Sequence, residues 1–446
     1  MPRCEDPRHL RDFVDVRTFK GRPHLPPARA HLRARAEKSR AEAPPGSSFP
    51  RKLSAFLKNQ VFGWLFSYIG FRFGPRHCFQ TYDDTGDDGI YRLAGNSYFS
   101  GKLQPNEDIR VSVAGDWATG TEESNRIAQR MTAFRPHYTI HLGDVYYVGD
   151  EDEVEANYLG SAQPGSARRS VLWPAGDNGA FALSGNHEMY ANGYAYFESI
   201  LPAMGVRPGK GARTGKQKAS FFCLRNKFWD IVGIDTGYNS VGLPVLELIP
   251  WFAPSCKLPK QLIDWLRMTV ELQESKRGLV LLGHHQYYSA FDRGFPRPAQ
   301  QLAEFIKRPV LWFWGHEHRM AVYGKASEGG IEAFGRCLGH GGMPVDIGVP
   351  PKEGQAPLVL YDDRKYTDLE GTPVGFNGLA NLTFSGDLLT VEYRDIEDRL
   401  LLTEAWRTQD GVLRGVRVER GFEDPQLITI GDLSKAIGGA SLGAAG

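Results

Sequence analysis

The sequence predicts an α/β fold, and two observations support this prediction. From about residue 108 onward, short apolar runs alternate with stretches of helical periodicity. The first helix is expected over Thr121–Phe134, where Ile127, Met131 and Phe134 share one face. Alternation of this kind is typical of a sheet whose strands are connected by helices.

Six apolar runs carry the expected strands of this core. They cover residues 109–114, 137–142, 181–184, 228–234, 278–283 and 310–315. Further helices are expected over Pro259–Lys276 and Pro298–Arg308, because each stretch opens with a proline, which suits a first helical turn. Residues Asn381–Asp395 alternate with a period of two around a Ser-Gly-Asp turn, and this pattern predicts an antiparallel hairpin.

The composition indicates a globular protein. Of the 446 residues, 41% are hydrophobic and 24% are charged, which excludes a mainly disordered or collagenous chain. The net charge of +1 gives no reason to expect nucleic-acid binding. The 5 cysteines are scattered, without a C-x-x-C pair, and no secretory signal is visible. These features predict reduced thiols and a cytoplasmic location, with association with membranes as a further option.

Three regions are expected along the chain. Residues 1–80 form a basic, partly disordered extension, 81–407 the main domain and 408–446 a C-terminal tail. The apolar residues between Leu53 and Tyr68 have helical spacing, and basic residues flank them. This amphipathic helix either docks on the core or on a second subunit, or makes a peripheral membrane contact through residues 51–73. The sequence leaves this choice and the oligomeric state open.

Five of the apolar runs end in glycine followed by a side chain that can bind metal. The residues after these glycines are Asp116, Asp144, Asn186 with His187, His284, and His316 with His318. The ligand crevice of an α/β sheet lies beyond the carboxyl ends of its strands. A glycine at each strand end lets the backbone turn sharply and approach a bound group. We therefore expect these side chains to converge on one place.

The predicted donors indicate which metals the site would bind. Two carboxylates, an amide oxygen and at least three imidazoles provide the mixed nitrogen and oxygen ligation that suits zinc, iron or manganese. Six or seven such groups are too many for one ion with an open position. They predict two metal ions that share a bridging carboxylate.

With these motifs in order, the sequence resembles the calcineurin-like metallophosphoesterases, whose signature runs D, GD, GNH[ED], GH[H] and GHxH. Within that superfamily it is most similar to the purple acid phosphatase type, because the second motif, GDVYY, fits GDxxY and ends in Tyr147. The resemblance implies a two-sheet β-sandwich flanked by helices in an α/β/β/α arrangement. One departure is the first motif, which reads Asp116-Trp117-Ala118 and lacks the histidine that many relatives carry.

The resemblance also implies which residue binds which metal. One ion would be held by Asp116, Tyr147 and His318, and the other by Asn186, His284 and His316. Asp144 would bridge them. The family binds two divalent or mixed-valence ions, iron with zinc, manganese or iron. The other interpretation of Tyr147 is an apolar pocket wall.

The expected activity is hydrolysis of a phosphate monoester. A metal-bridging hydroxide would attack phosphorus in line, and His187 would contact a phosphoryl oxygen or protonate the leaving group. His285 and His340 are candidate substrate-binding residues, His285 as a pocket residue and His340 within a Gly-rich turn. Two alternatives remain: a phosphodiesterase acting on nucleotides or lipid head groups, and a non-catalytic scaffold that binds metal.

Overall fold

The structure is a computed structural model that describes residues 75–83, 85–95, 108–160, 172–207, 215–242, 254–367 and 373–439. The amphipathic helix predicted within residues 51–73 and the basic segment before it lie outside the described residues. Among the helices that are described, none has the length and apolar character needed to cross a membrane.

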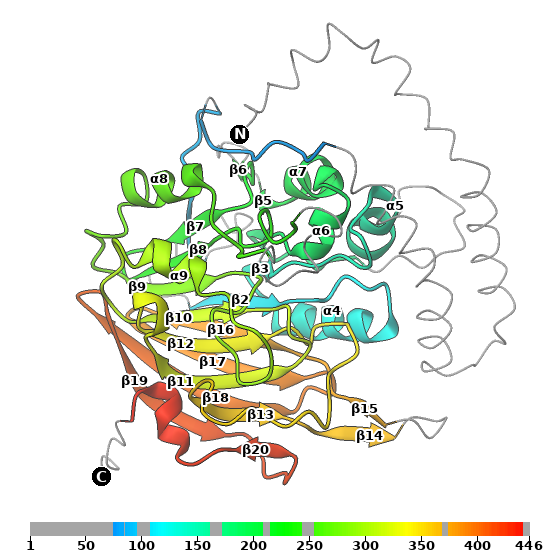
Figure 1. Cartoon of the computed structure of the whole chain (residues 1–446), viewed down its shortest axis with the longest axis vertical. Coiled ribbons are helices and arrows are strands. Elements are labelled where there is room, and N and C mark those ends of the chain that lie inside the picture. The colour runs from blue at the N-terminus through cyan, green and yellow to red at the C-terminus, as the bar shows by residue number, and fades with distance from the viewer. Residues whose placement is uncertain are drawn as a thin grey trace, which may run out of the picture.

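Two nine-stranded sheets form the centre of the molecule (Figure 1). In spatial order, the first sheet contains β1 (Ile90–Arg92), β7 (Phe222–Arg225), β8 (Trp229–Gly233), β9 (Gly278–Leu282), β10 (Val310–Trp314), β12 (Ala333–Leu338), β11 (Met320–Ala326), β13 (Leu358–Asp362) and β20 (Leu427–Thr429). The second contains β19 (Val412–Arg420), β18 (Leu400–Gln409), β17 (Leu388–Asp395), β16 (Gly378–Ser385), β2 (Ile109–Ala114), β3 (Tyr138–His141), β4 (Gly179–Ala182), β5 (Gly205–Val206) and β6 (Gly215–Lys216). A separate pair joins β14 (Lys365–Thr367) to β15 (Pro373–Gly375).

Helices cover the outer faces of both sheets. They are α4 (Glu122–Phe134), α5 (Glu151–Val154), α6 (Asn186–Tyr190), α7 (Leu201–Ala203), α8 (Lys260–Met268) and α9 (Arg297–Leu302). Short turns of other helix types are η2 (Glu155–Leu159), η3 (Tyr196–Ile200), η6 (Glu328–Gly330) and η7 (Leu433–Ile437). In Figure 1, α8 and α9 lie on one side of the molecule and α4 to α7 on the other.

Three apolar clusters hold these four layers together. The first lies between the sheets and the other two lie under the helices on either side. Strand β9 shows how one strand serves two clusters: Val280 and Leu282 belong to the cluster between the sheets, whereas Leu279 and Leu281 face the cluster under α8 and α9. Because both faces of such strands are buried, their sequences read as continuous apolar runs. The α/β/β/α prediction is confirmed.

The six predicted strands all form, as β2, β3, β4, β8, β9 and β10. The predicted hairpin is β16 and β17, whose pairing continues to Ser385 and Leu388 beside the turn. Helix α4 also forms as expected, with Thr121 as its N-cap accepting a hydrogen bond from Ser124 N.

The predicted helix over Pro259–Lys276 is too long. Helix α8 ends at Met268, and the N–H groups of Thr269 and Val270 both donate to the Trp265 carbonyl. Glu271 has a φ of 54° in the left-handed region, where a helix cannot continue. This turn directs Val270 and Leu272 into the core instead. Helix α9 is likewise shorter than predicted and covers Arg297–Leu302.

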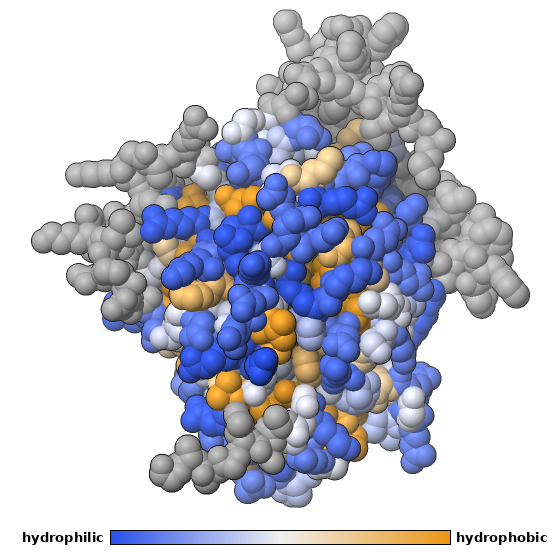
Figure 2. All heavy atoms as spheres, turned by 90° about the vertical axis from the view of Figure 1, so that its left-hand side faces the viewer, coloured by the Kyte–Doolittle hydropathy of each residue, from blue (hydrophilic) through white to orange (hydrophobic). Residues whose placement is uncertain are grey.

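Residues 408–439 do not form the separate tail that was expected. Strand β19 pairs with β18 at the edge of one sheet, and β20 pairs with β13 at the edge of the other. The buried Arg336 ties this end to the core, because its guanidinium pairs with Glu404 and donates to the Ala436 carbonyl at 2.8 Å. The domain therefore continues past residue 407. Figure 2 shows that the face on the left of Figure 1 is mainly hydrophilic, with hydrophobic atoms in small separate patches.

Candidate metal centre

The predicted ligands lie at strand ends that belong to both sheets. Parallel strands β2, β3 and β4 of one sheet lead to Asp116, Asp144 and Asn186, and parallel strands β9 and β10 of the other lead to His284 and His316. Because parallel strands place their carboxyl ends along one edge, these residues meet where the two edges lie together. The convergence predicted from the sequence is present.

Glycines at these strand ends leave room for the donors. A Cβ on Gly143 would lie 2.8 Å from His284 Nδ1, and a Cβ on Gly185 would overlap the Asp144 carboxylate. A Cβ on Gly315 would overlap Asp116 Oδ2. Any larger residue at these three positions would displace a candidate ligand, which explains the glycines before Asp144, Asn186 and His316.

Three of the candidate ligands have left-handed backbones. The φ angles are 56° for Asp116, 73° for Asp144 and 67° for His316. Non-glycine residues in this region cost on the order of 1–2 kcal/mol each, and such strain concentrates at functional sites. The turns after β2, β3 and β10 therefore place side chains at an energetic cost that the surrounding packing offsets.

Asp116 and His318 face each other across one part of the site. His318 Nε2 lies 3.6 Å from Asp116 Oδ1, while Asp116 Oδ2 accepts the His316 N–H at 2.8 Å. The hydroxyl of Tyr146 lies between them, 2.6 Å from Asp116 Oδ1 and 2.9 Å from His318 Nε2. The same hydroxyl also lies 3.2 Å from Asp144 Oδ2.

The tyrosine that makes these contacts is not the predicted ligand Tyr147. The phenol that contacts Asp116, Asp144 and His318 belongs to Tyr146, one residue earlier in the GDVYY motif. Tyr147 is half-buried, and its carbonyl accepts a hydrogen bond from His187 Nδ1 at 2.5 Å.

Asp144 and His284 form the other part of the site. His284 Nε2 lies 3.2 Å from Asp144 Oδ2 and 3.2 Å from Asn186 Oδ1. His187 donates its backbone N–H to Asp144 Oδ1 at 3.0 Å, and its Nε2 lies 3.7 Å from Asp144 Oδ2. Asp144 thus contacts groups on both sides of the site.

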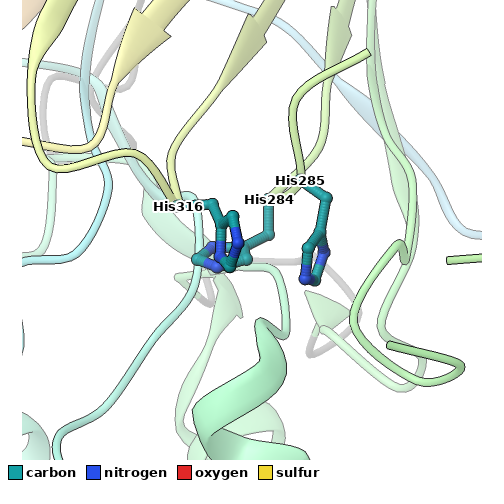
Figure 3. A group of neighbouring side chains, drawn as sticks. All are labelled: His284, His285 and His316. Carbon is teal, nitrogen blue, oxygen red and sulfur yellow. The ribbon is translucent and has the colours of Figure 1, made fainter. Parts of the chain in front are cut away.

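The imidazoles of His284, His285 and His316 gather at one place, as Figure 3 shows. The His316 ring lies 4.6 Å from the His285 ring and 5.3 Å from the His284 ring, between centroids. Two overlapping groups have donor atoms close enough to share an ion: His284 with His285 and His316, and His284 with Asp116 and Asp144. All ligand atoms within each group lie within 4.8 Å of one another.

Burial and the nearby carboxylates give the three imidazoles different pKa values, and therefore different charges at neutral pH. Burial alone would lower the pKa of His284, but the Asp144 carboxylate outweighs it and raises that pKa to about 9. Burial, reinforced by the charge of His284, lowers the pKa of His316 to about 4, and burial lowers the pKa of His285 as well. His285 and His316 are therefore neutral at neutral pH, which is the form of imidazole that binds metal.

A second layer of residues orients these groups. Glu188 accepts the N–H groups of Gly185 at 2.7 Å and Asp144 at 3.3 Å. The Leu142 carbonyl lies 3.0 Å from His284 Nδ1, so a proton on Nδ1 leaves Nε2 facing Asp144. Thr236 Oγ1 accepts the N–H groups of both His284 and His285. Such contacts set the tautomer and the direction of a ligand.

Sequence reasoning did not single out Tyr146 or Thr236. Glu188 is fully buried, and burial raises its pKa to about 8. A signal existed for Thr236, because it follows a sixth strand-like run, the one that forms β8. That run is followed by Asp-Thr-Gly and lacks the glycine-then-ligand pattern.

His340 lies in a different environment from the other histidines. A Cβ on Gly378 would lie 2.5 Å from His340 Nε2, so the imidazole packs against strand β16. Burial, together with the charge of Arg364, lowers the pKa of His340 to about 3. Its role in substrate binding stays a prediction to which these contacts add no support.

The calcineurin-like phosphoesterase family matches residues 109–320, the segment from β2 to the residues just after His318. Over this segment the chain is similar to the calcineurin-like phosphoesterases. The match includes all the glycine-then-ligand motifs from Asp116 to His318, and leaves the later strands of both sheets outside it.

Solved structures with similar folds have low sequence identity to this chain. GAP50, described as the anchor in the inner membrane complex of Plasmodium, is 13% identical, with a TM-score of 0.41 over 70% of this chain and 90% of that chain. PhoD is 13% identical, with a TM-score of 0.42 over 70% of this chain and 72% of that chain. No protein with a curated description matches the chain in sequence.

Proposed function

We propose that this protein hydrolyses phosphate monoesters with the help of two metal ions. The observation that carries the proposal is the pair of overlapping donor groups that share His284. One group adds Asp116 and Asp144, and the other adds His316, with the His285 imidazole beside it. Asn186 lies against His284 and His318 lies against Asp116, so together these residues offer more ligands than one ion uses. The match of residues 109–320 to the calcineurin-like phosphoesterase family supports a phosphoester as the substrate.

The residues present fit such a pair of ions. Asp116, Asp144 and His284 are fully buried, and ionised groups are buried in this way when they are paired or bind metal. His316 Nδ1 is buried and has no hydrogen-bond partner in the described part of the chain. Nitrogen and oxygen donors in this proportion favour zinc, iron or manganese.

The proposed ligand sets follow the contacts. Asp116, His318 and the phenol of Tyr146 would hold the first ion, and Asn186, His284 and His316 the second, with Asp144 between them. Tyr146 takes the place that the sequence pattern gave to Tyr147, because its hydroxyl touches all three groups expected around the first ion. A purple acid phosphatase type of centre would use this phenol.

Bound ions of this kind make water nucleophilic near neutral pH and neutralise the charge that builds on the phosphoryl oxygens. The protein contributes orientation: Glu188 fixes the turn before Asn186, and the Tyr146 hydroxyl fixes the Asp116 carboxylate. The buried setting strengthens each of these interactions, since charges interact more strongly where water is excluded.

His187 is placed to act on the substrate. Its Nδ1 donates to the Tyr147 carbonyl, which leaves Nε2 facing Asp144 and the site. Its side chain is 17% exposed, so it lies at the mouth of the site and not within the core. In the proposed reaction the imidazole acts in its doubly protonated form: Nδ1–H stays on the Tyr147 carbonyl, and the second proton, on Nε2, is donated to a phosphoryl oxygen or passed to the leaving oxygen.

Metal analysis together with a substrate pair tests this function. We expect about two transition-metal ions per chain and faster turnover of p-nitrophenyl phosphate than of bis-p-nitrophenyl phosphate. A preference for the diester would replace monoesterase with phosphodiesterase activity. Metal-replete protein that hydrolyses neither compound would contradict the proposal and leave the scaffold interpretation.

A further inference from the structure

The loop after His285 forms a wall of the candidate metal centre. This loop, Gln286–Phe295, ends in an aromatic ring that meets the His285 ring edge-on, with 5.1 Å between centroids. The same Phe295 ring lies 6.0 Å from the His316 ring. Phe295 is half-buried, so the loop borders the opening of the site.

Gln286 holds this loop in one shape. Its carbonyl accepts the Phe295 N–H at 2.9 Å, and its side-chain amide donates to the Arg293 carbonyl at 2.8 Å. Gln286 is almost fully buried, and Gly294 between the two contact points passes close to the Tyr287 backbone. Arg293 is therefore presented from a fixed backbone, although its own side chain is exposed.

The guanidinium of Arg293 is a cation without a carboxylate partner among the described residues. Its Cζ lies 5.3 Å from the centre of the Phe295 ring, and this is its side chain's contact with the wall. The adjacent Asp292 carboxylate accepts the Arg293 backbone N–H at 2.7 Å instead. By contrast, the buried Arg336 and Arg364 are each paired with carboxylates.

The position of this cation indicates a ligand. The proposed metal ions would neutralise the scissile phosphoryl group, so a second anionic group on the substrate would need a cation of its own. Because Arg293 covers the Phe295 face, the loop offers charge to the substrate and not an open ring for stacking. A planar guanidinium binds carboxylates and phosphates with paired hydrogen bonds.

We propose that Arg293 binds an oxyanion carried by the leaving group of the substrate, and that Gln286 positions it for this task. The substrate class is then a phosphate monoester whose alcohol or phenol bears a carboxylate or a second phosphate. This inference rests on the proposed function.

Three substrates that share one leaving-group skeleton test the proposal on the metal-replete full chain. They are phenyl phosphate, its 4-carboxy derivative and its 4-phosphonomethyl derivative. In Arg293→Gln, the ratio of kcat/KM for a charged substrate to that for phenyl phosphate should fall about tenfold, mainly through KM. Arg293→Lys should restore part of the ratio, and raised salt should reduce it in the wild type. The derivative with the larger fall identifies the preferred oxyanion.

Arg297→Gln is the matched control, since this exposed arginine lies four residues away and contacts Gln300 Oε1 at 3.2 Å. It should leave the ratio unchanged. Gln286→Leu, which removes the amide that holds Arg293, should lower the ratio while the chain stays folded. A ratio that is equal in wild type and Arg293→Gln, or that falls as far in Arg297→Gln, overturns the inference. Failure of the wild type to hydrolyse phenyl phosphate at all would instead overturn the proposed function.

Discussion

The Tyr146 hydroxyl donates a hydrogen bond to Asp116 Oδ1 across 2.6 Å, and both residues are buried. Burial and the two nearby carboxylates raise the pKa of Tyr146 well above its usual range, so without metal the phenol keeps its proton and acts as a donor. One side chain therefore orients Asp116 and occupies the space between it and His318.

Removing the hydroxyl of each tyrosine in turn distinguishes the role of Tyr146 from that of Tyr147. Tyr146→Phe should lower kcat and metal affinity by about 10- to 100-fold, since groups that orient or complete a metal site have effects of this size. Tyr147→Phe should have the smaller effect. Iron-loaded protein should likewise lose any tyrosinate absorption band in Tyr146→Phe. Equal activities in the two variants would contradict the assignment to Tyr146.

Asp144→Asn tests the shared carboxylate. The neighbouring His284 and His187 outweigh burial and hold the pKa of Asp144 well below its usual range, so the residue is an anion in contact with both halves of the site. Its amide should reduce turnover by about a thousandfold and lower the metal content from two ions to one or none. Metal analysis by mass spectrometry beside activity measures both effects, and a variant that keeps two ions and normal turnover rules out bridging by Asp144.

Alanine substitutions at two glycines that precede ligands should have opposite effects on metal binding. In Gly185→Ala, the new methyl group would overlap the Asp144 carboxylate, so metal binding and activity should fall sharply. Gly283→Ala places its methyl group 3.5 Å from Thr236 Cγ2, an ordinary contact, and should be tolerated. Isothermal titration with Zn²⁺ compares the two variants. Similar affinities would show that the turn before Asn186 yields more easily than the packing indicates.

The stability of the fold should depend on pH through Glu123 in the first turn of α4. Burial raises the pKa of this carboxyl to about 7, and its Oε2 has no hydrogen-bond partner among the described residues. A folded-state pKa above the unfolded value means that the stabilising, protonated form is complete at low pH and is lost as the pH rises from about 4.5 through 7.

Glu123→Gln should therefore stabilise the protein at pH 8 by on the order of 2 kcal/mol, and change little at pH 4.5. Urea unfolding at both pH values measures the difference. Glu122→Gln, at the exposed neighbouring position, is the control. A gain of the same size in both variants would assign the effect to the charge at the helix start and not to burial.

Much of the centre could be predicted because it follows one local rule, a buried strand that ends in glycine and a ligand. That rule depends on residues adjacent in sequence, so Asp116, Asp144 and His284 were found without tertiary information. This local rule could not decide whether Tyr146 or Tyr147 faces the site, since adjacent residues on an irregular turn can each face it. Thr236 orients His284 through a contact across 48 positions, which no local pattern reveals.

The elements that were predicted with wrong bounds share a physical cause. Strand β19 lies at a sheet edge, where half of its side chains meet water, so its Arg-rich sequence resembles a loop. Helix α8 keeps its apolar spacing beyond Met268, but Val270 and Leu272 reach the core from a turn. Periodicity reports which residues are buried, and it does not report whether the backbone between them stays helical.

The donors around the centre come from two different sheets, so a bound metal ion should stabilise the protein against unfolding. Any ion held jointly by the carboxylates after β2 and β3 and the imidazoles after β9 and β10 fastens one half of the sandwich to the other. A chelator such as EDTA should then lower the melting temperature and expose protease sites between the layers, because ligands that bind only the native state add their binding free energy to its stability. Heat resistance would rise and fall with the supply of metal in the surroundings, even in a variant that has lost all turnover.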